Sequence, residues 1–271
     1  MSARPCAGRG RAVAVAVLAA IVACTCPAAV RAESAPAPAA SSAPDAATPA
    51  QHHAAQGAHA PQHGAHGSAA GAHDATARHS FEDVEHWTRV FDDPARDAWQ
   101  KPAEVVAALG LAPGATVADL GAGTGYFSRH LSQAVGASGA VLAADTEPAL
   151  VEHLRRRAEQ EGLANLVPIL ASADNPRLPA AASDVVLIVD TWHHIDDRVQ
   201  YARRLTAALK PGGRVAIVDF QKRELPVGPP LDHKLAREQV VDEMTQAGYR
   251  LAGEPDVLPY QYVLLFAPAP R

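Results

Sequence analysis

The sequence predicts an α/β domain with a mainly parallel, doubly wound sheet of seven strands. From Ala115 onward, short runs of β-branched and apolar residues alternate with segments of helical periodicity, which is typical of a parallel α/β sheet. Glycine and proline mark the ends of several segments, and two late strands joined by a turn complete the pattern. The fold class follows from these three observations.

An N-terminal extension precedes this domain. Alanine, proline, histidine, glycine and serine dominate up to about Ala77, and the first aromatic residue is Phe81. A segment of this composition cannot bury enough apolar surface to fold. We therefore expect a disordered linker over residues 33–79 and an ordered domain over residues 80–271.

The first 32 residues have the three-part layout of a secretory signal peptide. Three arginines precede an apolar run over residues 12–23, which is too short to span a bilayer permanently, and small residues follow. Cleavage after Ala32 predicts an exported, periplasmic product. The segment ending at Cys24 also resembles a lipobox, but Cys26 and Pro27 crowd it, which favours a soluble product over a lipoprotein.

Composition limits the chemistry of the domain. The three cysteines, Cys6, Cys24 and Cys26, lie in the leader, so no disulfide or thiolate metal site is expected in the domain. The formal charge of −5 becomes −9 when cleavage removes four arginines and no acid. A protein with this charge and no basic stripe is not suited to binding nucleic acid.

Residues 51–73 of the linker contain six histidines, spaced mainly by alanine, glycine and glutamine. Flexible neutral imidazoles can chelate zinc, copper or nickel loosely, so one interpretation is weak transition-metal binding. The other is a compositionally biased tether, because the regular ligand spacing of a fixed metal site is missing. The six residues are His52, His53, His59, His63, His66 and His73.

The predicted elements follow in order along the domain. A helix over residues 102–109 leads into five strands, predicted at residues 116–120, 140–144, 166–170, 184–189 and 214–219. Helices over 126–135, 148–161 and 198–209 lie between them, and Lys210-Pro211-Gly212-Gly213 ends the last helix. A proline-rich loop, a helix over 234–247 and strands over 249–254 and 260–267 complete the domain.

A glycine loop runs directly from the first of these strands into a helix. Gly121 and Gly123 can adopt conformations closed to other residues and let a nucleoside approach the backbone. The acid at the end of the strand suits the cationic ammonium group of a methionine moiety, and it would be unfavourable beside a pyrophosphate. The loop consists of Asp119, Leu120, Gly121, Ala122, Gly123, Thr124 and Gly125.

Two more acidic residues follow strand ends. Asp145 closes the second strand, where a carboxylate accepts hydrogen bonds from both ribose hydroxyls, and Thr146 comes next. Asp174 follows the third strand and is expected to accept a bond from an adenine amino group, with Ala173 packing near the ring. The convergence of three strand ends predicts one nucleoside site.

These residues resemble class I S-adenosylmethionine-dependent methyltransferases, particularly the small-molecule group that includes the ubiquinone and menaquinone methyltransferases. The resemblance covers about residues 99–266, and its motifs are the 119–125 loop, Asp145, Asp174 and the segments 190–194 and 209–213. It implies a Rossmann-like sheet of strand order 3-2-1-4-5-7-6 with S-adenosylmethionine over the carboxyl ends of strands one to four. It also implies that Trp99-Gln100-Lys101-Pro102 helps close the methionine end of the cofactor; the alternative is that Trp99 is a packing anchor.

The predicted catalytic residues are Asp190, His193 and His194, which follow the fourth strand. Methyl transfer from a sulfonium is an in-line displacement, so the enzyme chiefly aligns donor and nucleophile and excludes water. An oxygen or carbon acceptor must also lose a proton, for which a histidine is suited. In the alternative interpretation, these histidines cap the following helix or pack on Trp192.

Two other functions stay open at this level. An NAD-dependent oxidoreductase also uses a glycine loop followed by an acid, but it places two residues before the final glycine, whereas Thr124 alone separates Gly123 from Gly125. The second is an exported ligand-binding or metal-handling protein without turnover, because S-adenosylmethionine is made in the cytoplasm. The residues favour a methyltransferase that acts on a small-molecule acceptor.

Overall fold

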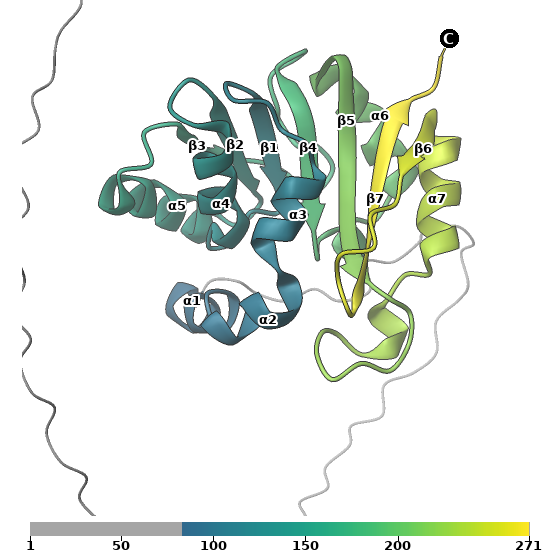
Figure 1. Cartoon of the computed structure of the whole chain (residues 1–271), viewed down its shortest axis with the longest axis horizontal. Helices are drawn as coiled ribbons and strands as arrows, with labels where there is room; N and C mark the ends of the chain where they lie inside the picture. Colours follow the sequence, from purple (N-terminus) through teal and green to yellow (C-terminus); the bar gives the residue numbers. More distant parts are fainter. Residues whose placement is uncertain (1–82, 271) are drawn as a thin grey trace, which may run out of the picture. The chain divides into compact units, whose positions relative to one another are not determined.

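Seven strands form one sheet in the computed structural model, which describes residues 83–270 (Figure 1). Their order is β3-β2-β1-β4-β5-β7-β6, which confirms the expected topology. The predicted signal peptide, histidine-rich linker and Cys24 lie outside the described residues and stay predictions. The strands are β1 (Thr116–Leu120), β2 (Ala140–Asp145), β3 (Leu166–Leu170), β4 (Ser183–Val189), β5 (Leu209–Phe220), β6 (Tyr249–Gly253) and β7 (Gln261–Pro268).

The direction of the strands brings the functional loops to one edge of the sheet. Neighbours among β1 to β5 pair in parallel, whereas β7 runs antiparallel to both β5 and β6. Asp119 pairs with Ala143 of β2 on one side and with Leu187 of β4 on the other. The strand order reverses between β1 and β4, which is where open α/β sheets bind their ligands.

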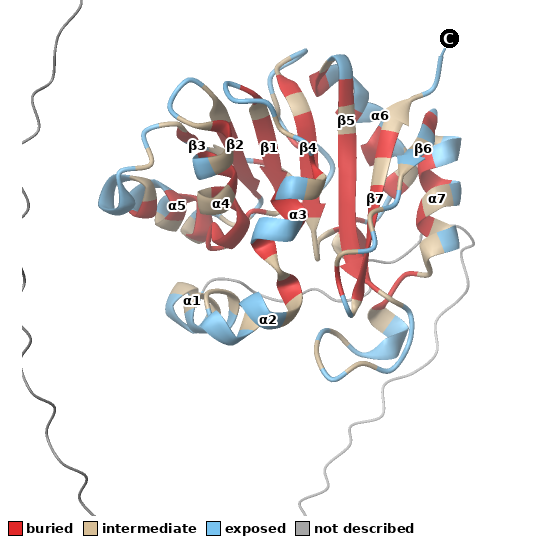
Figure 2. Ribbon diagram, in the orientation of Figure 1, coloured by how far each residue is buried: buried red, intermediate tan, exposed pale blue. Residues whose placement is uncertain are grey.

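Helices cover both faces of the sheet because alternate strand residues point to opposite sides. Val117 and Val141 pack with Leu131 in one buried cluster, on the side of α3 (Pro102–Ala108), α4 (Tyr126–Val135) and α5 (Pro148–Glu161). Ala118 and Leu142 belong to the other cluster, with α6 (Arg198–Ala208) and α7 (Arg237–Gln246). The central strands are buried on both faces (Figure 2).

The strand β5 begins earlier than the sequence predicts. The segment 210–213 was expected only to end a helix, and Gly212 does adopt a left-handed conformation, with φ of 80°. However, Leu209 already pairs with Ser183, and the register shifts before Arg214 pairs with Val185. The helix α6 ends at Ala208, and the four residues after Leu209 form an irregularity within β5.

Two short helices before α3 are absent from the sequence prediction. They are α1 (Val84–Phe91) and α2 (Asp97–Gln100), which are separated by a 3-10 helix, η1 (Pro94–Arg96). The carboxylate of Asp83 caps α1 by accepting a hydrogen bond from the His86 amide at 2.9 Å. α1 has eight residues and α2 has four, which is shorter than the roughly 11–18 residues over which helical periodicity is usually recognised. Within the described residues, no helix is long and apolar enough to cross a membrane.

Candidate functional site

A cavity of about 620 Å³ lies at the carboxyl ends of the central strands. One part of its wall is the glycine loop after β1 together with Asp145 and Thr146 after β2. The rest of the wall comes from the segment after β4, from α1 and from neighbouring aromatic side chains. We call the part lined by the predicted nucleoside-binding residues the first end of the cavity, and the part lined by aromatic side chains the second end. Of the predicted site residues, those that line it are Asp119, Gly121, Ala122, Gly123, Thr124, Asp145, Thr146, Ala173, Asp190, His193 and His194.

The glycine loop needs glycine at specific positions. Gly121 has φ of 73°, and a Cβ placed there would lie 2.3 Å from Oγ1 of Thr191 in the segment after β4. Gly125 has φ of 90°, and its Cβ would lie 2.7 Å from Leu154 of α5. Gly121 therefore allows two loops to meet at the cavity, whereas Gly125 allows helix packing and does not line the cavity.

Asp119 is a buried carboxyl group facing the cavity. Its side chain accepts a hydrogen bond from the Ser128 hydroxyl at 2.6 Å. Burial raises the pKa of Asp119 to about 6, and the charge of Asp145 adds to the increase while the bond from Ser128 opposes it. The group can therefore neutralise a cationic ligand group at neutral pH.

Replacing Asp119 with asparagine is expected to stabilise the protein at pH 8 by about 1–3 kcal/mol while weakening cofactor binding. The carboxyl group ionises at 3.8 in the unfolded chain and near 6 in the folded one, so its contribution to stability is lost as pH rises between these values. Asparagine does not ionise, so the variant does not lose this stability as the pH rises. Urea unfolding at pH 4 and pH 8 should show a larger gain at pH 8, and an equal gain at both would contradict the raised pKa.

Asp145 bridges the glycine loop and the start of α5. Its Oδ2 accepts a hydrogen bond from the Gly123 amide at 2.8 Å, and its Oδ1 accepts one from the Glu147 amide at 3.0 Å. Burial raises its pKa, and these backbone bonds oppose the increase. Each carboxylate oxygen keeps a further lone pair, so the group can also accept bonds from a diol.

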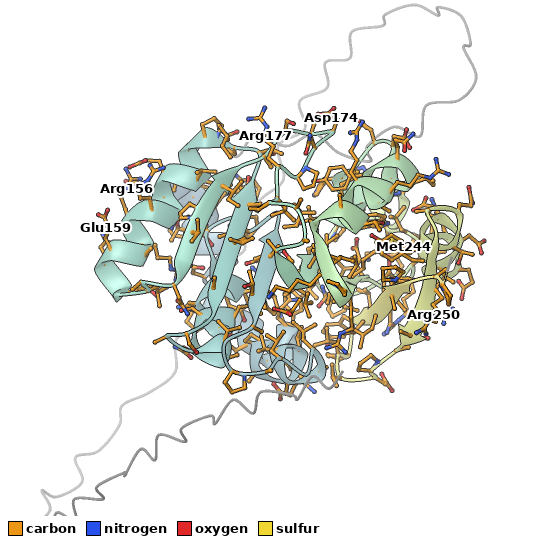
Figure 3. All side chains as sticks on the ribbon, turned by 90° about the horizontal axis from the view of Figure 1, so that it is seen from above. Arg156, Glu159, Asp174, Arg177, Met244 and Arg250 are labelled. Carbon is orange, nitrogen blue, oxygen red and sulfur yellow. The ribbon has the colours of Figure 1, made fainter. Side chains whose placement is uncertain are left out.

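Besides Gly125, two other predicted cofactor residues do not line the cavity. Asp174 is on the surface near Arg177 (Figure 3), with a side chain that is 77% exposed and an ion pair to Arg204 at 3.4 Å. Gln100 is fully buried and donates a hydrogen bond to Gln261 instead of lining the cavity. Periodicity cannot reveal such placements, because both depend on contacts between distant segments.

The segment after β4 carries a histidine–carboxylate pair. Nδ1 of His193 lies 2.9 Å from both carboxylate oxygens of Asp219, which is the penultimate residue of β5 and is fully buried. Burial lowers the pKa of His193, but the Asp219 carboxylate outweighs this effect and the net shift is upward. Asp219 fixes the ring so that Nε2 is the basic nitrogen. Sequence reasoning placed Asp219 in a strand and gave it no role.

Asp190 has an unusual backbone and an unusual charge environment. Its φ of 50° lies in the left-handed region, which is rare for residues other than glycine. Burial raises its pKa to about 7, the neighbouring Asp219 adds to this, and Arg96 at 3.7 Å opposes it. Strained backbone and perturbed carboxyl groups are often found at active sites.

The second end of the cavity has aromatic walls that sequence reasoning did not assign. Trp87 and Phe91 of α1, Trp99 of α2 and Phe220 line it. Arg96 also lines it, with its guanidinium 4.6 Å from the centre of the Tyr126 ring. Such walls suit a flat, largely apolar molecule with one polar group.

One arginine holds α1 against the glycine loop. Nη1 of Arg157, a buried residue of α5, donates to the Thr124 carbonyl at 2.8 Å and to the Asp92 carboxylate at 2.7 Å. The Thr124 hydroxyl donates to the same carboxylate at 3.0 Å. The aromatic wall and the glycine loop therefore share one set of polar contacts. In the described part of the chain, no three histidine, cysteine or acidic side chains are arranged to hold a metal ion.

Comparison with known proteins agrees with this geometry. Residues 117–213 match a family model described as a methyltransferase domain. A ubiquinone/menaquinone biosynthesis C-methyltransferase of Hahella chejuensis is 30% identical over 119 residues, 44% of this chain and 48% of that protein. One of Ectopseudomonas mendocina is 30% identical over 152 residues, 56% of this chain and 58% of that protein. The chain thus spans about half the length of the curated relatives it matches.

A solved structure extends the similarity across the described domain. The S-adenosylmethionine-dependent methyltransferase from Aquifex aeolicus has a TM-score of 0.65 and 26% sequence identity. The alignment covers 70% of this chain and 98% of the Aquifex chain. The relationship therefore includes the sheet and the strand ends that form the cavity.

Proposed function

We propose that this chain is a class I S-adenosylmethionine-dependent methyltransferase that transfers a methyl group to a small-molecule acceptor. The observation that carries the proposal is the single cavity, in which Asp119, the glycine loop and Asp145 occupy one end. The Asp219–His193 pair reaches the other end. Cofactor-binding groups and a proton acceptor thus face one cavity.

The residues of the first end fit the cofactor. Asp119 is positioned to pair with an ammonium group, and Asp145 has free acceptor capacity for the two ribose hydroxyls. The small side chains of Ala122 and Ala173 leave room for a flat base. When bound, S-adenosylmethionine supplies an electrophilic methyl group on its sulfonium.

The second end fits an acceptor whose nucleophile is an oxygen or a carbon. Such acceptors must lose a proton, and His193 can take it through Nε2 while Asp219 stabilises the resulting imidazolium. The aromatic walls exclude water and hold the acceptor flat against the donor. The matched relatives are named for C-methylation in quinone biosynthesis, which supports an aromatic, hydroxylated acceptor.

Cofactor binding tests the proposal directly. Isothermal titration should show binding of S-adenosylmethionine and none of NAD. Replacing Asp145 with alanine should weaken S-adenosylmethionine binding by about 10- to 100-fold, because each lost hydrogen bond involves a charged group. Asp242→Ala, at an exposed position of α7, is the matched control and should leave the affinity unchanged. Binding of NAD in place of S-adenosylmethionine would overturn the proposal.

Turnover is a separate measurement. Methyl transfer from labelled S-adenosylmethionine to a panel of hydroxylated aromatic acceptors should yield methylated product and S-adenosylhomocysteine in equal amounts. Binding of the cofactor without transfer to any acceptor would contradict the enzymatic part of the proposal.

A further inference from the structure

Two buried glutamines join segments that are far apart in the sequence. Gln100 ends α2 and is 0% exposed, and Gln261 begins β7 and is 3% exposed. Nε2 of Gln100 donates a hydrogen bond to Oε1 of Gln261 at 2.8 Å. Neither residue lines the cavity, so ligand contact does not account for either of them.

The pair belongs to a chain of hydrogen bonds with one direction. Nη2 of Arg96 donates to Oε1 of Gln100 at 3.0 Å, and Nε2 of Gln261 donates to Oδ1 of Asp190 at 2.5 Å. Because a guanidinium can only donate, Gln100 must turn its oxygen toward Arg96 and its amide nitrogen toward Gln261. Gln261 must then turn its own nitrogen toward Asp190. This series of hydrogen bonds begins at the Arg96 guanidinium and ends at the Asp190 carboxylate, which accepts the last bond.

Charged groups around Asp190 act in opposite directions on its ionisation, so an uncharged hydrogen-bond donor affects its pKa. Asp219 of β5 disfavours its ionised form, whereas Arg96 of η1 and His193 favour that form. Tyr262 of β7 is a further titratable neighbour, and its pKa is raised by burial and then by the nearby acids. Gln261 is the uncharged group that donates to the Asp190 carboxylate, and its bond lowers the pKa of Asp190.

The left-handed conformation of Asp190 is also held by hydrogen bonds to β5 and β7. A left-handed φ at a residue with a side chain costs about 1 kcal/mol or more and persists only when surrounding contacts hold it. The Asp190 amide donates to the Val218 carbonyl at 2.9 Å, and Gln261 holds the side chain. Backbone and side chain are thus fixed from β5 and β7 respectively.

We propose that Gln100 and Gln261 are positioning residues that hold the Asp190 carboxylate ionised and oriented beside His193. In this role Asp190 stabilises the imidazolium that forms when His193 takes the proton of the acceptor. Gln100 thereby acts through Gln261 and not on the cofactor. The inference rests on the proposed methyl transfer, but the state of Asp190 can be measured without turnover.

The test replaces Gln261 with methionine, which keeps the length of the side chain and removes the donor. The titration of Asp190, followed by NMR of carbon-labelled carboxyl groups, should move up by about one to two pH units. The acid limb of the kcat profile should move by the same amount, so that kcat falls about 5- to 50-fold at pH 7 and recovers to within about twofold at pH 9. The KM for S-adenosylmethionine should stay within about twofold, because neither glutamine lines the cavity.

Two further variants keep the test decisive. Gln100→Met leaves Gln261 free to rotate and should give a smaller shift of the same sign, and Gln133→Met, at an exposed position of α4, should give none. An unshifted Asp190 titration in both Gln261→Met and Gln100→Met, or an equal loss of kcat at every pH, would overturn the inference. A wild-type protein without turnover would instead contradict the proposed function, and the NMR titration would still decide on the glutamines.

Discussion

Replacing His193 with alanine is expected to lower kcat by about 100- to 10,000-fold, the usual contribution of a general base. Its ring is held by Asp219 and faces the cavity, so the variant loses the group that takes the proton from the acceptor. The affinity for S-adenosylmethionine should change by less than about twofold, because His193 is not one of the groups proposed to bind the cofactor. Single-turnover kinetics with saturating cofactor measure the chemical step directly.

Two further variants test the role of Asp219 and provide a control. Asp219→Asn keeps the shape of the acid but no longer stabilises the imidazolium, and kcat should fall by a similar order. His86→Ala removes an exposed histidine of α1 that does not line the cavity, and it should leave kcat unchanged. Normal turnover by His193→Ala would exclude the histidine as the proton acceptor.

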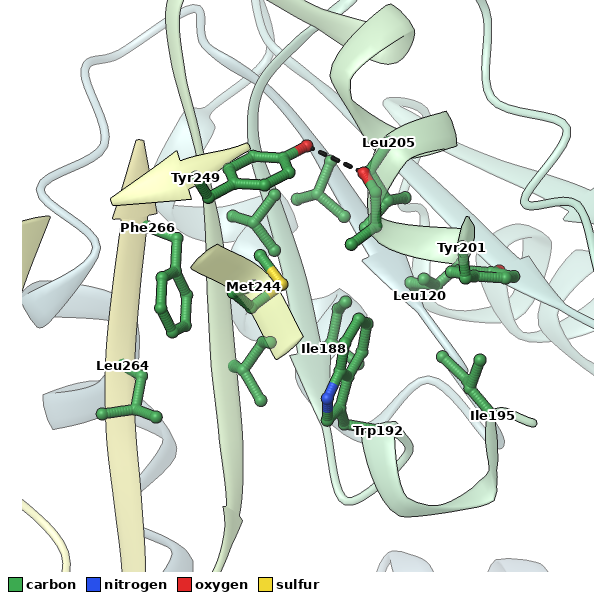
Figure 4. Close-up of a cluster of buried hydrophobic side chains, with 14 of the residues drawn as sticks. Leu120, Ile188, Trp192, Ile195, Tyr201, Leu205, Met244, Tyr249, Leu264 and Phe266 are labelled. Carbon is green, nitrogen blue, oxygen red and sulfur yellow. Dashed lines mark hydrogen bonds between the residues drawn. The ribbon is translucent and has the colours of Figure 1, made fainter. Parts of the chain in front are cut away.

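Replacing Glu243 with alanine is expected to lower the free energy of unfolding by about 3–5 kcal/mol, because it leaves a buried arginine without its partner. Both oxygens of Glu243 accept bonds from Arg198, at 2.8 and 2.9 Å, and one accepts a bond from the Trp192 indole at 3.3 Å. Trp192 is fully buried in the core cluster between the sheet and α7 (Figure 4). Urea unfolding followed by tryptophan fluorescence gives the measurement.

Glu238 of the same helix provides the control. Its side chain is 75% exposed and 3.6 Å from Arg237, so Glu238→Ala should change the stability by less than about 0.5 kcal/mol. A loss of under about 1 kcal/mol in Glu243→Ala would show that the buried ion pair is dispensable. Trp192 donates to Glu243 and is the residue before His193. Loss of this bond in Glu243→Ala should therefore also disturb His193 and lower the activity of the folded protein.

The sheet was predictable because its strands and loops are strongly marked. The strand Thr116–Leu120 and the helices Tyr126–Val135 and Pro148–Glu161 occur as predicted, since apolar runs and helical periodicity are bounded there by glycine or proline. The helix α1 was missed although its apolar residues have helical spacing, because it has only eight residues and directly follows the low-complexity extension. Its aromatic side chains line the cavity, which its sequence does not reveal.

The site was predictable only where its residues lie next to strand ends. Asp119 and Asp145 follow from position alone, because parallel strands bring their carboxyl ends together. The contact between His193 and Asp219 spans 26 residues and depends on the pairing of β4 with β5. The contact between Gln100 and Gln261 spans 161 residues and joins a helix to the last strand. No local pattern encodes either contact.

The shared contacts of Arg157 link the two halves of the cavity thermodynamically. A ligand that orders the glycine loop at Thr124 also orders α1 through Asp92. A ligand that orders α1 stabilises the glycine loop by the same free energy, because linkage between two binding sites is reciprocal. Donor and acceptor should therefore bind with positive cooperativity. The product that has lost its methyl group leaves the same contacts intact, so it should compete with the donor and slow its own release.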